Sequence, residues 1–197
     1  GGDPYRIVAG SGGTVRVQDE GSQLVALALA AAAPIREGER WLDLCAGPGG
    51  KTALLAAVAR EHDVVVEANE VIPTRARLVR NALRAVPGEV VVHEADGREL
   101  ASSRPGEFDR ILVDAPCTGL GALRRRPEAR WRKSPADVAE LVPLQGELLS
   151  AAVEALAPGG IVAYVTCSPH LAETTGVVQD VLRSRDDLRV LDTRAVV

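Results

Sequence analysis

The chain has 197 residues, of which 46% are hydrophobic and 25% are charged, and its formal net charge is −4. This length and composition predict one globular domain with a core of its own. No segment of the sequence has the pattern of a signal peptide, and no apolar run is long enough to span a membrane. The negative charge argues against a protein that coats nucleic acid indiscriminately.

The chain alternates between apolar runs and amphipathic segments. We expect strands at residues 15–17, 41–45, 90–92, 110–113 and 161–166, a strand that begins at residues 64–66, and a short last strand at residues 189–191. We expect helices at residues 20–33, 52–60, 73–86, 134–157 and 171–183, with a long connection at 115–133. Continuous apolar strands between helices predict an α/β fold with a mainly parallel sheet and helices on both faces.

Residues 1–19 are interpreted as an N-terminal extension and residues 20–197 as the main domain. The sequence contains no methionine, so we expect it to be a piece of a longer protein. Cys45, Cys117 and Cys167 are an odd number of cysteines at wide spacings. This pattern fits neither a disulfide framework nor a zinc motif, so we expect reduced thiols, no metal and a cytoplasmic protein.

A glycine-rich turn, Asp43-Leu-Cys-Ala-Gly-Pro-Gly-Gly-Lys-Thr, follows the strand at 41–45. A Walker loop ending in Lys51-Thr52 would need glycine at position 45, and a dinucleotide fingerprint starting at Gly47 would need glycine at position 52. Glycines let the backbone approach a ligand closely, and a helix N-terminus favours a carboxylate such as that of S-adenosylmethionine. A tight turn without a ligand is the alternative.

Two acids follow the next two strands. Glu70 stands where an acid accepts both hydroxyls of a ribose, and Asp96 could accept from an adenine amino group. Alone, each is typical of an N-cap or turn. Together, at successive strand ends, they predict a nucleoside pocket.

Two cysteines follow the last two long strands, in Asp114-Ala-Pro-Cys-Thr-Gly and Thr166-Cys-Ser-Pro. Neighbouring strands lie about 5 Å apart, so we expect Asp114, Cys117 and Cys167 to face one pocket. A lone buried cysteine is more often a small core residue, but two beside proline at strand ends favour a reactive site.

Residues 124–133 carry six basic side chains and one acid, with Trp131 among them. A basic, aromatic-containing loop suits a phosphate backbone and an unstacked base. A solvated loop that packs Trp131 on the domain is equally consistent with the pattern.

In this order, these motifs resemble the RsmB/Sun (Fmu) family of S-adenosylmethionine-dependent RNA cytosine-5 methyltransferases, from about Asp19 to Leu182. The resemblance implies the Rossmann-like class I methyltransferase fold. It assigns Cys167 as the nucleophile and Cys117 as the cysteine that helps release product. It places the cofactor against Cys45, Ala46, Gly47, Pro48, Gly49, Gly50, Lys51, Glu70, Asp96 and Asp114.

The segment from Arg124 to Trp131 resembles the bacterial branch that acts on small-subunit ribosomal RNA, which makes RNA the expected partner of a monomer. Its expected RNA contacts are Arg124, Arg125, Arg126, Arg130 and Trp131. Two departures stand out. Glu70 stands where many relatives have Asp, and we expect the family's N-terminal RNA-binding domain and last strand to be absent from this sequence.

Three alternatives stay open. A DNA cytosine-5 methyltransferase would use Cys117 as the nucleophile, but the cysteine at 167 has no place in that family's pattern. A tRNA could be the substrate in place of ribosomal RNA. A non-catalytic RNA-binding assembly factor would not need both cysteines and Asp114.

Overall fold

A computed structural model describes residues 4–124 and 127–196. In this part of the chain, one sheet has the strand order β3-β2-β1-β4-β5, and every neighbouring pair is parallel. The strands are β1 (Arg40–Asp43), β2 (Val65–Asn69), β3 (Val91–His93), β4 (Phe108–Asp114) and β5 (Leu156–Val165). The strand order reverses between β1 and β4, and the carboxyl ends at such a reversal form the usual ligand crevice of an open α/β sheet.

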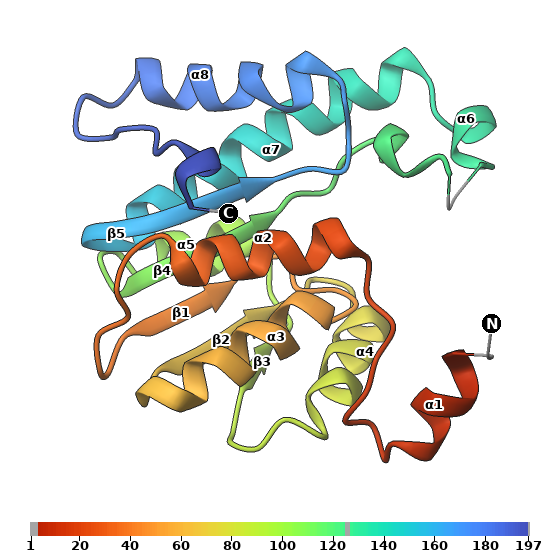
Figure 1. Ribbon diagram of the computed structural model, residues 1–197. Coiled ribbons are helices and arrows are strands. Elements are labelled where there is room, and N and C mark those ends of the chain that lie inside the picture. The colour runs from red at the N-terminus through yellow and green to blue at the C-terminus, as the bar shows by residue number, and fades with distance from the viewer. Residues whose placement is uncertain (1–3, 125–126, 197) are drawn as a thin grey trace.

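Helices cover both faces of the sheet (Figure 1). The described helices are α1 (Pro4–Gly10), α2 (Glu20–Ala31), α3 (Gly50–Ala59), α4 (Pro73–Leu83), α5 (Gly97–Ser102), α6 (Ala129–Arg132), α7 (Pro135–Ala155) and α8 (Thr175–Arg183), of which α1 and α6 lie apart from the sheet. Short 3-10 turns lie at Arg60–His62, Leu120–Ala122, Leu171–Glu173 and Thr193–Ala195. The predicted fold class is confirmed. No helix among the described residues is long and apolar enough to cross a membrane.

The core has a separate apolar cluster on each face. Leu42, Ile111 and Val113 of the sheet pack with α5 and α7 on one face. Trp41, Val66 and Leu112 alternate with them and pack with α2 and α3 on the other. Because side chains in a strand point alternately to opposite faces, continuous apolar strands follow directly from this double cover.

Several predicted elements differ from the structure. The strand expected at 15–17 is wrong, because this segment pairs with no strand, and Val17 is 69% exposed. The strand expected at 189–191 is also wrong, because these residues have no regular structure and precede a 3-10 turn. Helix α5 was not predicted, and β5 begins before the expected Pro-Gly-Gly turn, at Leu156. Its register against β4 is interrupted there, with Phe108 opposite Leu156 but Arg110 opposite Ile161.

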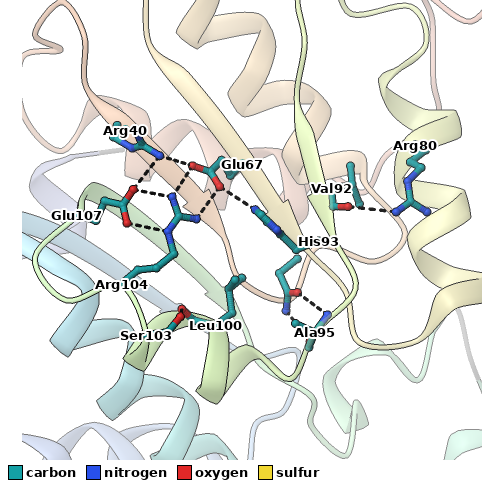
Figure 2. Close-up of polar contacts among 11 residues, drawn as sticks. Arg40, Glu67, Arg80, Val92, His93, Ala95, Leu100, Ser103, Arg104 and Glu107 are labelled. Atoms are coloured by element: carbon teal, nitrogen blue, oxygen red, sulfur yellow. Dashed lines mark hydrogen bonds and ion pairs between the residues drawn. The ribbon is translucent and has the colours of Figure 1, made fainter.

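A charged network covers the face of the sheet at its β2–β3 edge, away from the cysteines (Figure 2). The Glu67 carboxylate of β2 accepts from both terminal nitrogens of Arg104, at 2.6 and 2.9 Å. It also lies 2.6 Å from Arg40 Nη2 and 2.7 Å from His93 Nε2. The hydrogen bonds from Arg104 are the largest cause that lowers the pKa of Glu67, to about 2. This network joins β1, β2 and β3 to the end of α5.

Candidate active site

The glycine-rich turn after β1 lies tightly against its neighbours. A Cβ added to Gly47 would stand 2.2 Å from Glu70 Oε2, and one added to Gly49 would stand 2.7 Å from the Val79 Cα. Gly49 also has a φ of +100°, which disfavours any other residue. These two glycines are therefore required for the close approach of the turn to β2 and α4.

Glu70 is buried and holds the turn in place. Its carboxylate accepts from the backbone N–H groups of Gly47 at 3.1 Å and of Ile72 at 3.0 Å. Arg75 completes the arrangement, since its guanidinium lies 3.4 Å from Glu70 and donates to the Gly47 carbonyl at 2.9 Å. Arg75 carried no signal in the sequence, because one arginine on an amphipathic helix looks like a surface residue.

Asp96 follows β3 and caps α5. Its carboxylate accepts from the Arg98 backbone N–H at 2.9 Å and from the Arg98 guanidinium. Asn69 links the segment before Asp96 to the glycine-rich turn. Its side-chain amide donates to the Leu44 and Ala95 carbonyls, at 3.1 Å each. The turns after β1 and β3 are thus joined through the end of β2.

Asp43 is a further polar group of this crevice that the sequence analysis did not single out. Its side chain is buried, with Oδ2 accepting from the Thr52 hydroxyl at 2.6 Å. Oδ1 is also buried and has no hydrogen-bond partner among the described residues. Burial is the largest cause that raises the pKa of Asp43, to about 7. The end of β1 therefore offers one buried acceptor oxygen that no described residue occupies.

Asp114 lies at the end of β4 and pairs with Lys51 of α3. Asp114 Oδ2 lies 2.6 Å from Lys51 Nζ, and both side chains are partly exposed. The ion pair bridges the switch point from the β1 side to the β4 side. It brings together two residues that the sequence analysis assigned to the cofactor site.

The two predicted active-site cysteines meet, with their Sγ atoms 3.5 Å apart. The hydrogen bond from Cys117 is the largest cause that lowers the pKa of Cys167, and it correspondingly raises the pKa of Cys117. Burial raises the pKa of the third thiol, Cys45. Cys167 is also the exposed member of the three. The site thus favours one thiolate, at Cys167.

His170 has a structural role. Its Nδ1 accepts from the Ala172 N–H at 3.2 Å and caps the 3-10 turn before α8. The same turn ends at Glu173, whose carboxylate lies buried beneath the cysteine loops. The sequence analysis did not predict a role for Glu173, because nothing in the local sequence indicates that this acidic side chain is buried.

The described residues among the predicted RNA contacts make none of the hydrogen bonds or ion pairs described above for the crevice. Trp131 of α6 is 83% exposed, so the interpretation that it packs on the domain is wrong. The Arg130 guanidinium lies 5.5 Å from the Trp131 ring centroid. Figure 1 shows α6 projecting from the side of the sheet where β4 and β5 end. Arg124 is exposed, and Arg125 and Arg126 lie outside the described residues.

Comparison with known proteins places the chain in a family. A family model described as 16S rRNA methyltransferase RsmB/F matches residues 30–196. The chain belongs to this family. The resemblance drawn from the three motifs is therefore confirmed, and with it the family's cofactor, S-adenosylmethionine.

Two relatives illustrate the range of similarity. A protein of Mycobacterium tuberculosis that carries the name of a methyltransferase is 58% identical over 98% of this chain. The ribosomal RNA small subunit methyltransferase B of Salmonella paratyphi B is 39% identical over 92% of this chain. The chain spans 41% of the length of each of these relatives.

Solved structures agree on the fold. A methyltransferase homologue from Pyrococcus horikoshii has a TM-score of 0.77 and 31% identity, over 93% of this chain and 57% of its own. The NSun6 protein of the same organism, solved with the S-adenosylmethionine analogue SFG, has a TM-score of 0.77 and 27% identity, over 89% of this chain and 44% of its own.

Proposed function

We propose that the protein transfers a methyl group from S-adenosylmethionine to carbon 5 of a cytosine in RNA, with small-subunit ribosomal RNA as the substrate class. The observation that carries this proposal is the pair of sulfurs 3.5 Å apart at the carboxyl ends of β4 and β5. Cytosine carbon 5 needs covalent activation by a nucleophile before it accepts a methyl group. Methylation of a nitrogen or a ribose hydroxyl needs no cysteine nucleophile.

The crevice fits the cofactor. Its glycines allow backbone approach, and Asp43 offers a buried oxygen without a partner among the described residues. We assign the turn from Cys45 to Lys51 to the methionine part of S-adenosylmethionine, and Glu70 to its ribose hydroxyls. Asp96 is assigned to the adenine. When bound, S-adenosylmethionine supplies an electrophilic methyl group.

Cys167 begins the reaction. Its thiolate adds to carbon 6 of the cytosine, and the new C–S bond makes carbon 5 nucleophilic. The lowered pKa of Cys167 increases the thiolate fraction at neutral pH. Because carbon 6 is attacked from above the ring, the target base must leave its stack. Once carbon 5 is methylated, a base takes its proton, the C–H electron pair re-forms the double bond between carbons 5 and 6, and the C–S pair leaves on sulfur as the thiolate.

Asp114 and Cys117 assist these steps. Asp114, held by Lys51, accepts a hydrogen bond from the cytosine amino group and orients the ring. The Cys117 thiol stays protonated because its pKa is raised, and it lies within reach of the Cys167 sulfur. Its S–H group stabilises that sulfur as it leaves carbon 6. Cys117 thus favours the Cys167 thiolate before addition and assists its departure after methylation.

Bisulfite sequencing tests this function. The full-length protein is incubated with S-adenosylmethionine and unmodified small-subunit ribosomal RNA, with Cys167→Ala as the matched control. We expect one cytosine to become resistant to bisulfite conversion with the wild type and none with Cys167→Ala. Methyl incorporation without any protected cytosine, or protection by the Cys167→Ala variant, would contradict the proposal.

A further inference from the structure

A buried carboxylate lies directly beneath the two cysteine loops. Glu173 is 0% exposed and accepts from four donors. Oε1 accepts from the Thr118 backbone N–H at 2.8 Å and from Gln145 Nε2 at 3.1 Å. Oε2 accepts from the hydroxyls of Thr118 and Ser168, at 2.5 Å each. A charge with this many donors is satisfied without a cation.

Three of the four donors belong to the residues that follow the two cysteines. Thr118 comes directly after Cys117, and Ser168 comes directly after Cys167. The two hydroxyls also lie 3.1 Å from each other. Glu173 therefore joins loops that are fifty positions apart in the chain, at the point where each presents its sulfur.

Other contacts around Glu173 limit its movement. Gln145 Nε2 also donates to the Pro116 carbonyl at 2.8 Å, and the Tyr164 hydroxyl donates to the Glu173 carbonyl at 2.8 Å. Gly121 adds a direct link between the loops, because its N–H donates to the Cys167 carbonyl at 2.9 Å. A Cβ on Gly121 would stand 2.8 Å from that oxygen.

We propose that Glu173 is a positioning residue that sets the distance between Cys117 and Cys167, so that the Cys117 thiol donates to the Cys167 sulfur. Its four hydrogen bonds determine where both loops lie, and no atom of Glu173 needs to contact substrate. The proposal rests on the proposed function only in naming Cys167 as the nucleophile.

The charge state of Glu173 suits this role. Burial alone would raise the pKa of Glu173, but the hydrogen bonds from Ser168, Thr118 and Gln145 outweigh burial and hold it below the usual range. A carboxylate accepts from all four donors at once, whereas a protonated carboxyl would have to donate one proton. The ionised form therefore holds both loops.

Several charged or titratable groups also surround the sulfurs, and the test has to separate them from Glu173. They come from the end of β4, from β5 and from α3: Asp114, Tyr164 and Lys51. A variant cycle that pairs Glu173 with Cys117 keeps all the others constant.

Thiol alkylation over a range of pH tests the proposal without RNA or cofactor. Iodoacetamide modification of the Cys167 peptide is measured by mass spectrometry for wild type, Glu173→Ala, Cys117→Ala and the double variant. We expect each single substitution to raise the pH midpoint of Cys167 modification by roughly one unit, towards that of a free thiol. The double variant should match Cys117→Ala, because Glu173 acts through Cys117.

An unshifted midpoint in Glu173→Ala, or a double variant that shows the full sum of both shifts, would overturn the proposal. Should Glu173→Ala not fold, Glu173→Gln replaces it and should give a smaller rise, because the amide keeps one acceptor. The affinity for S-adenosylmethionine should stay unchanged in Glu173→Gln. If the cycle behaves as expected but no cytosine is methylated, the proposed function fails and the positioning role stands.

Discussion

Asp43 and the two cysteines show how one environment gives neighbouring groups different protonation behaviour. Burial raises the pKa of Asp43 to about 7, whereas the pKa of Cys167 falls because a second thiol donates to it. The Asp43 carboxyl has one hydrogen-bonded oxygen and one without a partner among the described residues. Burial therefore decides the direction of the shift at Asp43, whereas a hydrogen-bond partner for the charged form decides it at Cys167.

Asp43 predicts a pH dependence of stability. A raised folded-state pKa means that its contribution to stability is fully present below pH 4 and is lost as the pH rises to about 7. At about 1.4 kcal/mol per pH unit, the loss between pH 5 and pH 7 is about 2–3 kcal/mol. Urea unfolding at both pH values measures it. Asp43→Asn should lack this component, and parallel pH profiles for variant and wild type would contradict the assignment.

At the scale of the elements, a buried arginine donates hydrogen bonds to the backbone carbonyls at the C-terminal end of α2. The Arg110 guanidinium is 2% exposed and lies 2.8 Å from Glu39 Oε2. Its remaining N–H groups donate to the carbonyls of Leu29, Ala30, Ala33 and Pro34. One side chain of β4 thus supplies donors to a helix end that has no glycine cap.

Arg110→Ala should destabilise the protein by about 3–5 kcal/mol, because it leaves the buried Glu39 with only the exposed Arg36 as a cation and removes the donors from the end of α2. Chemical denaturation measures the loss. Arg183→Ala is the matched control, since its partner Asp180 is exposed on α8. We expect no change in the unfolding midpoint for the control. Equal effects of the two substitutions would show that Arg110 does not hold α2.

Elements with a strong apolar pattern could be predicted from sequence, and those held by tertiary contacts could not. The five strands of the described sheet and the five longest described helices follow from apolar periodicity. Val15–Val17 had the composition of a strand but no neighbour to pair with. Among the site residues, the cysteines and glycines carried motif signals. Arg75 and Glu173 did not, because their roles depend on contacts with distant parts of the chain.

At the scale of the whole molecule, a net charge of −4 coexists with a basic, exposed α6 region beside the strand ends. Arg124 and Arg130 are exposed, and Trp131 presents its ring to solvent. We propose from this distribution that RNA binds at this edge of the crevice, where an unstacked base can meet an aromatic ring.

Neutralising Arg124 and Arg130 together should weaken RNA binding and reduce its salt dependence, by a slope of about 0.7–0.9 for each lost phosphate contact. Titrations at several salt concentrations measure this, and calorimetry should show unchanged affinity for S-adenosylmethionine. The control is the pair Arg183 and Arg185, near the end of α8. An equal loss of cofactor affinity would show that α6 supports the fold instead.

We propose that Cys167 attacks the base and that Cys117 assists its release after methylation. A denaturing gel with labelled substrate RNA and S-adenosylmethionine tests it most directly. Cys117→Ala should accumulate a denaturation-resistant protein–RNA complex, because addition proceeds while release is slowed. Cys167→Ala should form no such complex and transfer no methyl group. A trapped complex with Cys167→Ala and none with Cys117→Ala would contradict the account and make Cys117 the nucleophile.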